Sequence, residues 1–195
     1  MDTQRFQRLI ARIDQLNAED PRRVIVDGVE RPFEQVYAER VTAWVLRLDP
    51  RVSEWIQIAA KGQHVQRWKI ARDSYPRTTA GYLRWREALK AFHAQTVAGL
   101  MRQEQYNDAD IEQVVSLILK RPSADKAQLQ VLEDALCLVF LETQLEELKL
   151  KVADARLREV VRKTWGKMSE QARQEALKLP LDSSQRAWLI EAVAS

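Results

Sequence analysis

Two acidic residues stand directly ahead of one of the most apolar stretches of the chain, and their positions suggest a buried polar site. In the run 131–145, VLEDALCLVFLETQL, helical spacing places Asp134 on a stripe with Leu138 and Glu133 on a stripe with Phe140. Carboxylates are rarely buried unless they are paired, hydrogen-bonded or bound to a metal. This segment is therefore a candidate source of metal ligands or of a general base.

The two histidines of the chain, His64 and His93, both fall among small or apolar neighbours in helix-forming segments. Glu39 lies in a segment that is apolar on two sides, which is typical of a central helix and allows its carboxylate to point inward. Imidazole and carboxylate groups together suit a borderline divalent ion such as Fe, Mn, Co, Ni or Zn. We therefore predict a divalent transition-metal site made by Glu39, His64, His93 and Asp134, with Glu133 as a further ligand or as the general base.

Each of these residues also has a purely structural interpretation. Glu39 can form a surface pair with Arg40, and either histidine can be a core residue satisfied by a hydrogen bond. The chain has no compact motif of the His-Glu-x-x-His kind. The metal prediction therefore depends on four residues from four separate helices converging.

Basic side chains gather around the one long irregular stretch, residues 69–81. Arg67, Arg72 and Arg77 lie in or beside it, and Arg86 follows in the next helix-forming segment. Guanidinium groups hold phosphate or carboxylate through paired hydrogen bonds. We predict that these three arginines, Arg67, Arg72 and Arg77, bind a small anionic, phosphorylated ligand. The alternative is a solvated basic loop.

Helices must position these side chains, because Gly (5) and Pro (6) are too scarce among 195 residues for many tight turns. Apolar spacing predicts helices ending near residue 17 and covering about 33–48, 51–68, 82–103, 108–120 and 126–151. A further helix is predicted to end at about 165, with two short ones after residue 169. Val24 and Val26 before Asp27-Gly28 indicate a small β-ribbon. We predict an all-α bundle with one N-terminal β-ribbon, forming a single domain over 1–195 in which 169–195 is a C-terminal helical appendage.

Charge and cysteine content limit the classes of function. Lys and Arg (31) nearly balance Asp and Glu (28), and a net charge of +3 is too small to argue for nucleic-acid binding. A lone cysteine, Cys137, excludes a disulfide framework and favours a reducing compartment. No segment approaches the roughly 18 consecutive apolar residues of a membrane span, and the N-terminus reads as an amphipathic helix. We expect a cytoplasmic protein without a membrane partner, and the oligomeric state stays open.

Several long strings resemble the family named domain of unknown function 4202, and together they span nearly the whole chain. They are YAERVTAWVLRLDP, QHVQRWKIARDSYPRTTAGYLRWR, FHAQT, LEDALCLVFLE and KTWGKMS. The resemblance implies little chemistry.

The order of elements also resembles the HD-domain metal-dependent phosphohydrolases, all-helical proteins whose ligands follow the order His…His-Asp…Asp. On that pattern Glu39 occupies the first His position, Gln63-His64 replaces the His-Asp pair, and Asp134 matches the final Asp. His93 resembles the additional His of some members. The chain departs from the pattern by lacking the bridging carboxylate of the His-Asp pair, so a single ion or a fold without metal are both open.

These features together predict a metal-dependent phosphohydrolase acting on a phosphorylated small molecule or nucleotide, in which the metal lowers the pKa of a bound water. Two alternatives stay open. One is a non-haem iron enzyme that uses oxygen, since histidine and carboxylate ligands in a helical bundle also suit iron. The other is a non-catalytic HD-like module that binds RNA or a protein through the basic loop.

Overall fold

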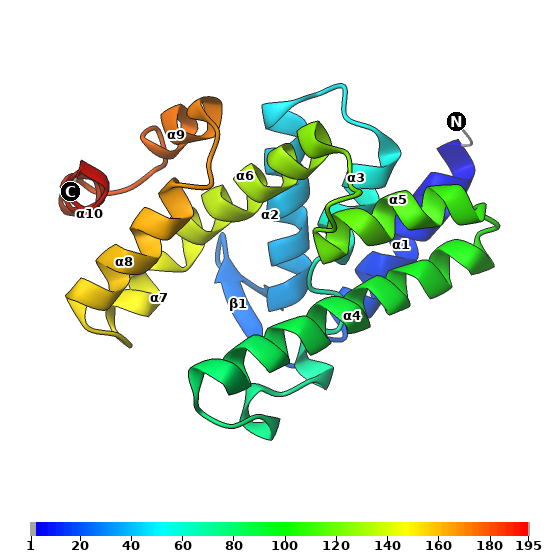
Figure 1. Cartoon of the computed structure of the whole chain (residues 1–195), viewed down its shortest axis with the longest axis horizontal. Helices are drawn as coiled ribbons and strands as arrows, with labels where there is room; N and C mark the ends of the chain where they lie inside the picture. The colour runs from blue at the N-terminus through cyan, green and yellow to red at the C-terminus, as the bar shows by residue number, and fades with distance from the viewer. Residues whose placement is uncertain (1–2, 195) are drawn as a thin grey trace.

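The computed structural model describes residues 3–194, and helices dominate this part of the chain (Figure 1). The first half contains α1 (Thr3–Ala18), β1 (Arg23–Val26), β2 (Val29–Pro32), α2 (Phe33–Leu48), α3 (Glu54–Gly62) and the 3-10 turns η1 (Arg67–Lys69) and η2 (Arg72–Ser74). The second half contains α4 (Thr79–Gln103), α5 (Asp108–Leu119), α6 (Lys126–Thr143), α7 (Leu145–Lys149), α8 (Asp154–Trp165), α9 (Glu170–Ala176) and α10 (Ser183–Ala194). The predicted all-α fold with one small ribbon is confirmed, and the outermost positions of the predicted domain, 1, 2 and 195, lie outside the described residues.

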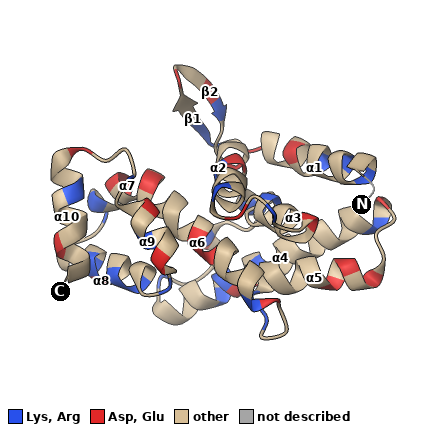
Figure 2. Cartoon of the chain, turned by 90° about the horizontal axis from the view of Figure 1, so that it is seen from above, with Lys and Arg blue, Asp and Glu red and all other residues tan. Residues whose placement is uncertain are grey.

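The two strands form an antiparallel hairpin in which Val26 pairs with Val29. Its turn residues Asp27 and Gly28 have φ values of 51° and 78°. Positive φ at both central positions is what a tight hairpin of right-handed twist requires, and Asp-Gly supplies it with little strain. Figure 2 shows the ribbon projecting from the helical body, so it contributes little to the core.

Helix α2 is central, because it packs against α6, α3 and α1. Val41 and Val45 are fully buried, and the indole N–H of Trp44 donates to Glu142 of α6 over 2.9 Å. The two-sided apolar pattern of this segment therefore reflects contact with neighbours on more than one side. This placement brings the first turn of α2 close to the end of α3.

Two predicted helices differ from the structure. The helix predicted over 51–68 ends at Gly62 and continues as turns and η1, with Gln66 in the left-handed region at φ 51°. A Cβ on Gly62 would collide with the Val97 side chain of α4, so the close approach of α3 and α4 requires glycine there. The helix predicted to reach about 151 is interrupted at Gln144, where the hydroxyl of Thr143 donates back to the Val139 carbonyl.

The C-terminal helices share the core of the bundle. Ala172 and Ala176 of α9 are fully buried where α9 packs on α6, and Leu189 of α10 is fully buried against α8. One continuous cluster of buried apolar residues runs from Leu9 in α1 to Ala192 in α10. Among the helices of residues 3–194, none is both long and apolar enough to cross a membrane.

Candidate functional site

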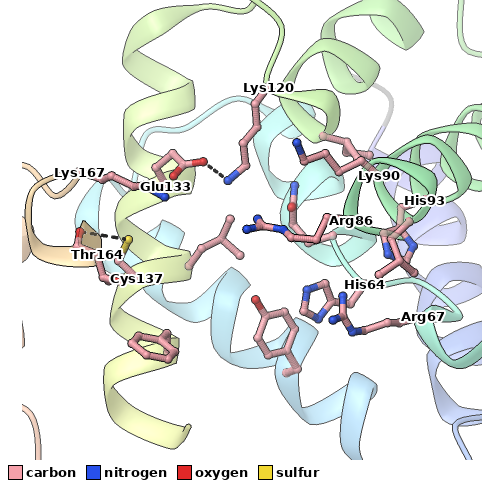
Figure 3. A pocket seen from close by; sticks show the side chains of 16 residues that line it. His64, Arg67, Arg86, Lys90, His93, Lys120, Glu133, Cys137, Thr164 and Lys167 are labelled. Atoms are coloured by element: carbon pink, nitrogen blue, oxygen red, sulfur yellow. Dashed lines mark hydrogen bonds and ion pairs between the residues drawn. The ribbon is translucent and has the colours of Figure 1, made fainter. Parts of the chain in front are cut away.

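A cavity of about 220 Å³ lies where α2, the end of α3, α4, the end of α5, α6 and the α8–α9 connection meet (Figure 3). Its charged lining comprises five cations and one carboxylate, namely Arg67, Arg86, Lys90, Lys120, Lys167 and Glu133. With both histidines neutral, the wall carries a surplus of four positive charges. A cavity of this charge attracts anions and disfavours cations.

The cations differ in how far they are already neutralised. Lys90 pairs with Glu87 and Lys120 with Glu133, whereas Arg86 and Lys167 have no carboxylate partner among residues 3–194. In Figure 3, Arg86 reaches into the middle of the cavity, between the Lys120–Glu133 pair and the two histidines. Burial, together with the nearby charges of Lys167 and Arg86, lowers the pKa of Lys120 to about 8. This crowding of like charge favours occupation of the cavity by an anion.

His64, which is partly buried, forms an acid–base pair with the buried Glu34 at the start of α2. Its Nδ1 lies 3.0 Å from Oε2 of Glu34, whose side chain is only 7% exposed. A carboxylate accepts, so Nδ1 carries the proton and Nε2 keeps a free lone pair. The ring also stacks on Tyr37, with centroids 4.1 Å apart and planes 6° apart. Burial lowers the pKa of His64 although Glu34 opposes that effect, so the imidazole is neutral at pH 7 and able to accept a proton.

Two buried polar groups at the cavity have no partner in the described part of the chain. His93, 2% exposed, donates from Nδ1 to the Val65 carbonyl over 2.8 Å, which leaves Nε2 as an unpaired acceptor. The side-chain amide nitrogen of Gln63 is likewise buried and unpaired. Leaving a buried polar group unpaired costs about 1–3 kcal/mol. An unpaired donor and an unpaired acceptor at one cavity therefore indicate that a polar ligand or water completes the site.

Acidification from pH 7 to pH 5 should destabilise the protein through His93. Burial lowers the pKa of this residue to about 3, so between its ordinary pKa near 6.5 and pH 3 the unfolded chain binds the extra proton. The contribution of neutral His93 to the free energy of unfolding is therefore fully present above the unfolded pKa and is lost as pH falls. Between pH 7 and pH 5 the loss is about 2 kcal/mol for one histidine. Urea unfolding at the two pH values measures the loss, and His93→Gln should reduce it by about that amount. An equal loss in wild type and variant would contradict the assignment.

The structure brings together only part of the predicted metal set. His64 and His93 are neighbours, with ring centroids 6.0 Å apart. Glu39 instead pairs with Arg31 of β2 over 2.7 Å, and neither Glu39 nor Asp134 lines the cavity. Asp134, 3% exposed, accepts from the backbone N–H of Ser169 and from Gln130 over 2.8 and 2.9 Å. Its burial is thus explained by hydrogen bonds that hold the start of α9.

The donor set therefore fits a metal ion poorly. Within residues 3–194, no three His, Cys, Asp or Glu side chains form a group that could hold an ion. The positive surplus of the wall also opposes a divalent cation. Metal binding stays a prediction, and no step below depends on it.

Of the three arginines predicted to bind an anion, only Arg67 lines the cavity. Arg67 lines the cavity, where its Nε lies 3.9 Å from Glu34 and its guanidinium lies over the Trp85 ring at 4.7 Å. Arg72 donates to the carbonyls of Tyr75 and Pro76 and so braces its own loop. Arg77 is exposed and pairs with Asp73. Glu133 lines the cavity as the partner of Lys120.

Sequence reasoning missed Glu34, Lys90 and Lys120 and gave Arg86 no role in binding. Glu34 occupies the first turn of a helix, where an acidic residue is favoured by the helix dipole alone and carries no functional signal. Lys120 occupies the left-handed position that ends α5, at φ 56°, where it reads as a helix terminator. Only the packing of the helices turns these side chains toward one cavity.

Comparison with known proteins gives a family and no activity. A family model described as domain of unknown function (DUF4202) matches residues 7–189, which is most of the chain. No curated protein and no solved structure gives a significant match. The resemblance to HD-domain phosphohydrolases stays a prediction.

Proposed function

Because the chain belongs to the family described as domain of unknown function (DUF4202), whose description names no reaction, we propose a function from the cavity itself. The protein binds a phosphorylated small molecule there and hydrolyses its phosphate ester, with His64 as the general base. The observation that carries the proposal is the meeting of a strongly cationic wall with a neutral imidazole whose Nε2 is free. A cytoplasmic location accords with the single thiol, Cys137, which is buried and forms no disulfide.

Charge supports a phosphate as the bound group. A phosphate monoester carries between one and two negative charges at neutral pH. Arg86 and Lys167, the two cations without carboxylate partners, can neutralise it, and Arg67 and Lys90 add to the field. Hydrogen bonds between charged partners are roughly twice as strong as neutral ones, so this wall recognises phosphate in preference to neutral groups.

Hydrolysis of the ester uses His64 on one side of the cavity and Lys120 on the other. Nε2 of His64 takes a proton from water as the water oxygen attacks phosphorus, and the imidazolium that forms is stabilised by Glu34. The bond between phosphorus and the ester oxygen breaks, and its electron pair leaves with that oxygen. Lys120, across the cavity from His64 and with a pKa of about 8, gives the leaving oxygen a proton. Attack and departure from opposite sides match the in-line geometry of phosphoryl transfer.

Binding of inorganic phosphate tests the first requirement of the proposal, which is that the cavity holds a phosphate group. Arg86→Gln should weaken binding at least tenfold, because a charge-assisted hydrogen bond contributes about 1.5–3 kcal/mol. Titration calorimetry at about 50 mM salt measures this effect, and release of p-nitrophenol from p-nitrophenyl phosphate measures turnover.

The matched control is Arg84→Gln on the same helix, whose exposed side chain does not line the cavity. It should bind phosphate as tightly as wild type. Equal weakening in the two variants, or no binding by wild type, would overturn the proposal.

The iron-dependent oxygen enzyme and the RNA- or protein-binding module stay predictions. A phosphate-binding protein without turnover is the nearest rival, because the same cationic wall would serve it. That rival predicts phosphate binding with no p-nitrophenol release.

A further inference from the structure

A second cavity of about 230 Å³ adjoins the first and shares three of its wall residues, His64, Arg67 and Phe140. We call it the side chamber. It is bounded by the start of α2, the end of α6 and α7, and its remaining lining is Arg22, Phe33, Glu34, Gln144, Glu147, Leu148 and Lys151. His64 therefore stands on the partition between two cavities.

The side chamber differs from the first cavity in charge. Glu147 pairs with both Arg22 and Lys151, and Glu34 lies beside Arg67 and His64. Three cations thus face two carboxylates that they already contact, and the surplus is a single positive charge. A chamber with its charges internally paired has little attraction for a second anion.

Apolar and planar groups make up much of the remaining wall. Phe33 and Phe140 present rings, Leu148 adds an aliphatic surface, and Gln144 supplies one amide. The guanidinium of Arg22 lies over the Phe33 ring at 3.8 Å, which fixes that ring in place. These three apolar side chains form a patch in a wall whose other seven residues are polar or charged, and such a patch can hold the ring of a small organic molecule.

Size argues against a chamber that only admits water. One water needs about 10–15 Å³ of such volume, so about 230 Å³ exceeds the need of a single attacking water more than tenfold. The imidazole of His64 lines both spaces. Whatever nucleophile the base deprotonates can therefore come from the side chamber.

We propose that the side chamber binds an uncharged, ring-bearing alcohol, which replaces water as the acceptor of the phosphoryl group. This inference rests on the proposed function and names the second substrate class of the same site. Nε2 of His64 removes the hydroxyl proton, the alcohol oxygen forms the new bond to phosphorus, and the bond to the leaving oxygen breaks. The leaving oxygen takes its proton from Lys120, so the products are a phosphorylated alcohol and the dephosphorylated donor.

The test supplies p-nitrophenyl phosphate as donor and compares two acceptors at equal concentration, 2-phenylethanol and ethanol. Phosphorylated alcohol and inorganic phosphate are both quantified by ³¹P NMR in the same reaction. A ring held in the chamber should give 2-phenylethanol at least a tenfold higher yield than ethanol. Leu148→Trp, which fills the chamber, should bring that ratio close to one, and Gln144→Trp serves as an independent second filling variant.

The ratio of two products cancels any general loss of activity in the variants. Equal yields from the two alcohols in wild type, with p-nitrophenol still released, would overturn the acceptor chamber and leave hydrolysis standing. A ratio that the filling variants do not change would also overturn it. No p-nitrophenol release by wild type would overturn both proposals.

Discussion

Replacing His64 by alanine should lower the turnover of p-nitrophenyl phosphate at least 100-fold, while phosphate binding changes less than threefold. A positioned general base contributes about 10²–10⁴ to a rate, and His64 keeps the Nε2 lone pair free because its Nδ1–H donates to Glu34. The anion is held by Arg86 and Lys167 rather than by the imidazole, so affinity should survive. Initial rates measured together with calorimetric titration of phosphate separate the two effects.

Two further variants sharpen this prediction. Glu34→Gln should reduce turnover about tenfold or more, because an amide can neither fix the Nδ1–H tautomer as firmly nor stabilise the imidazolium. Glu39→Gln is the matched control, on the same helix but paired with Arg31 away from the cavity, and should leave turnover within twofold. A His64→Ala protein that keeps more than a tenth of wild-type turnover would exclude His64 as the base.

Replacing Asp134 by alanine should lower the free energy of unfolding by about 2–4 kcal/mol. The variant loses the acceptor for the Ser169 N–H and for Gln130, and a hydrogen bond to a charged group contributes about 1.5–3 kcal/mol. Asp134→Asn should lose less, because an amide oxygen still accepts one of these bonds. Urea unfolding at pH 7 measures both variants.

The Asp134 variants also decide between a structural role and a metal-binding one. A structural role predicts that Mn, Fe, Zn or Ni salts change the melting temperature of wild type and variant equally. Elemental analysis of protein purified without chelator or histidine tag gives the complementary result, and His64→Ala/His93→Ala provides its comparison. Stoichiometric metal that disappears in the double variant would restore the predicted metal site. So would metal salts that raise the melting temperature of wild type and not that of the Asp134 variants.

The sequence predicts the helical class and most helix bounds well, because these depend on local spacing. The segment predicted over 33–48 is α2 as found, and the Asp-Gly turn of the ribbon is found where expected. Gln144 carries no Pro or Gly signal, so the interruption between α6 and α7 has no marker in the sequence. Thr143 bonds back to the Val139 carbonyl at this point, but Thr42 and Thr96 make the same kind of bond within unbroken helices, so the bond does not mark the interruption.

The site is predicted less completely, because periodicity fixes a direction within a helix and leaves the neighbouring helix unknown. His64 and His93 share apolar faces and do meet. Glu39 points from the other side of α2, toward the ribbon and Arg31, which the helical pattern could not distinguish from an inward position. Lys167 reaches the cavity only because α9 packs on α6, as in the hydrogen bond from Ser169 to Asp134, which lies 35 residues earlier in the chain.

The hydrogen bonds that hold the start of α9 link ligand occupancy to the order of that helix. Gln130 donates both to Asp134, which accepts the Ser169 N–H at the start of α9, and to the carbonyl of Lys167, so α6 holds the start of α9 and the backbone of a cavity lysine together. An anion bound by Lys167 favours the docked arrangement of α9 by thermodynamic linkage, because Lys167 lines the cavity in that arrangement. Amide hydrogen exchange in residues 170–176 should therefore slow down when an anion fills the cavity.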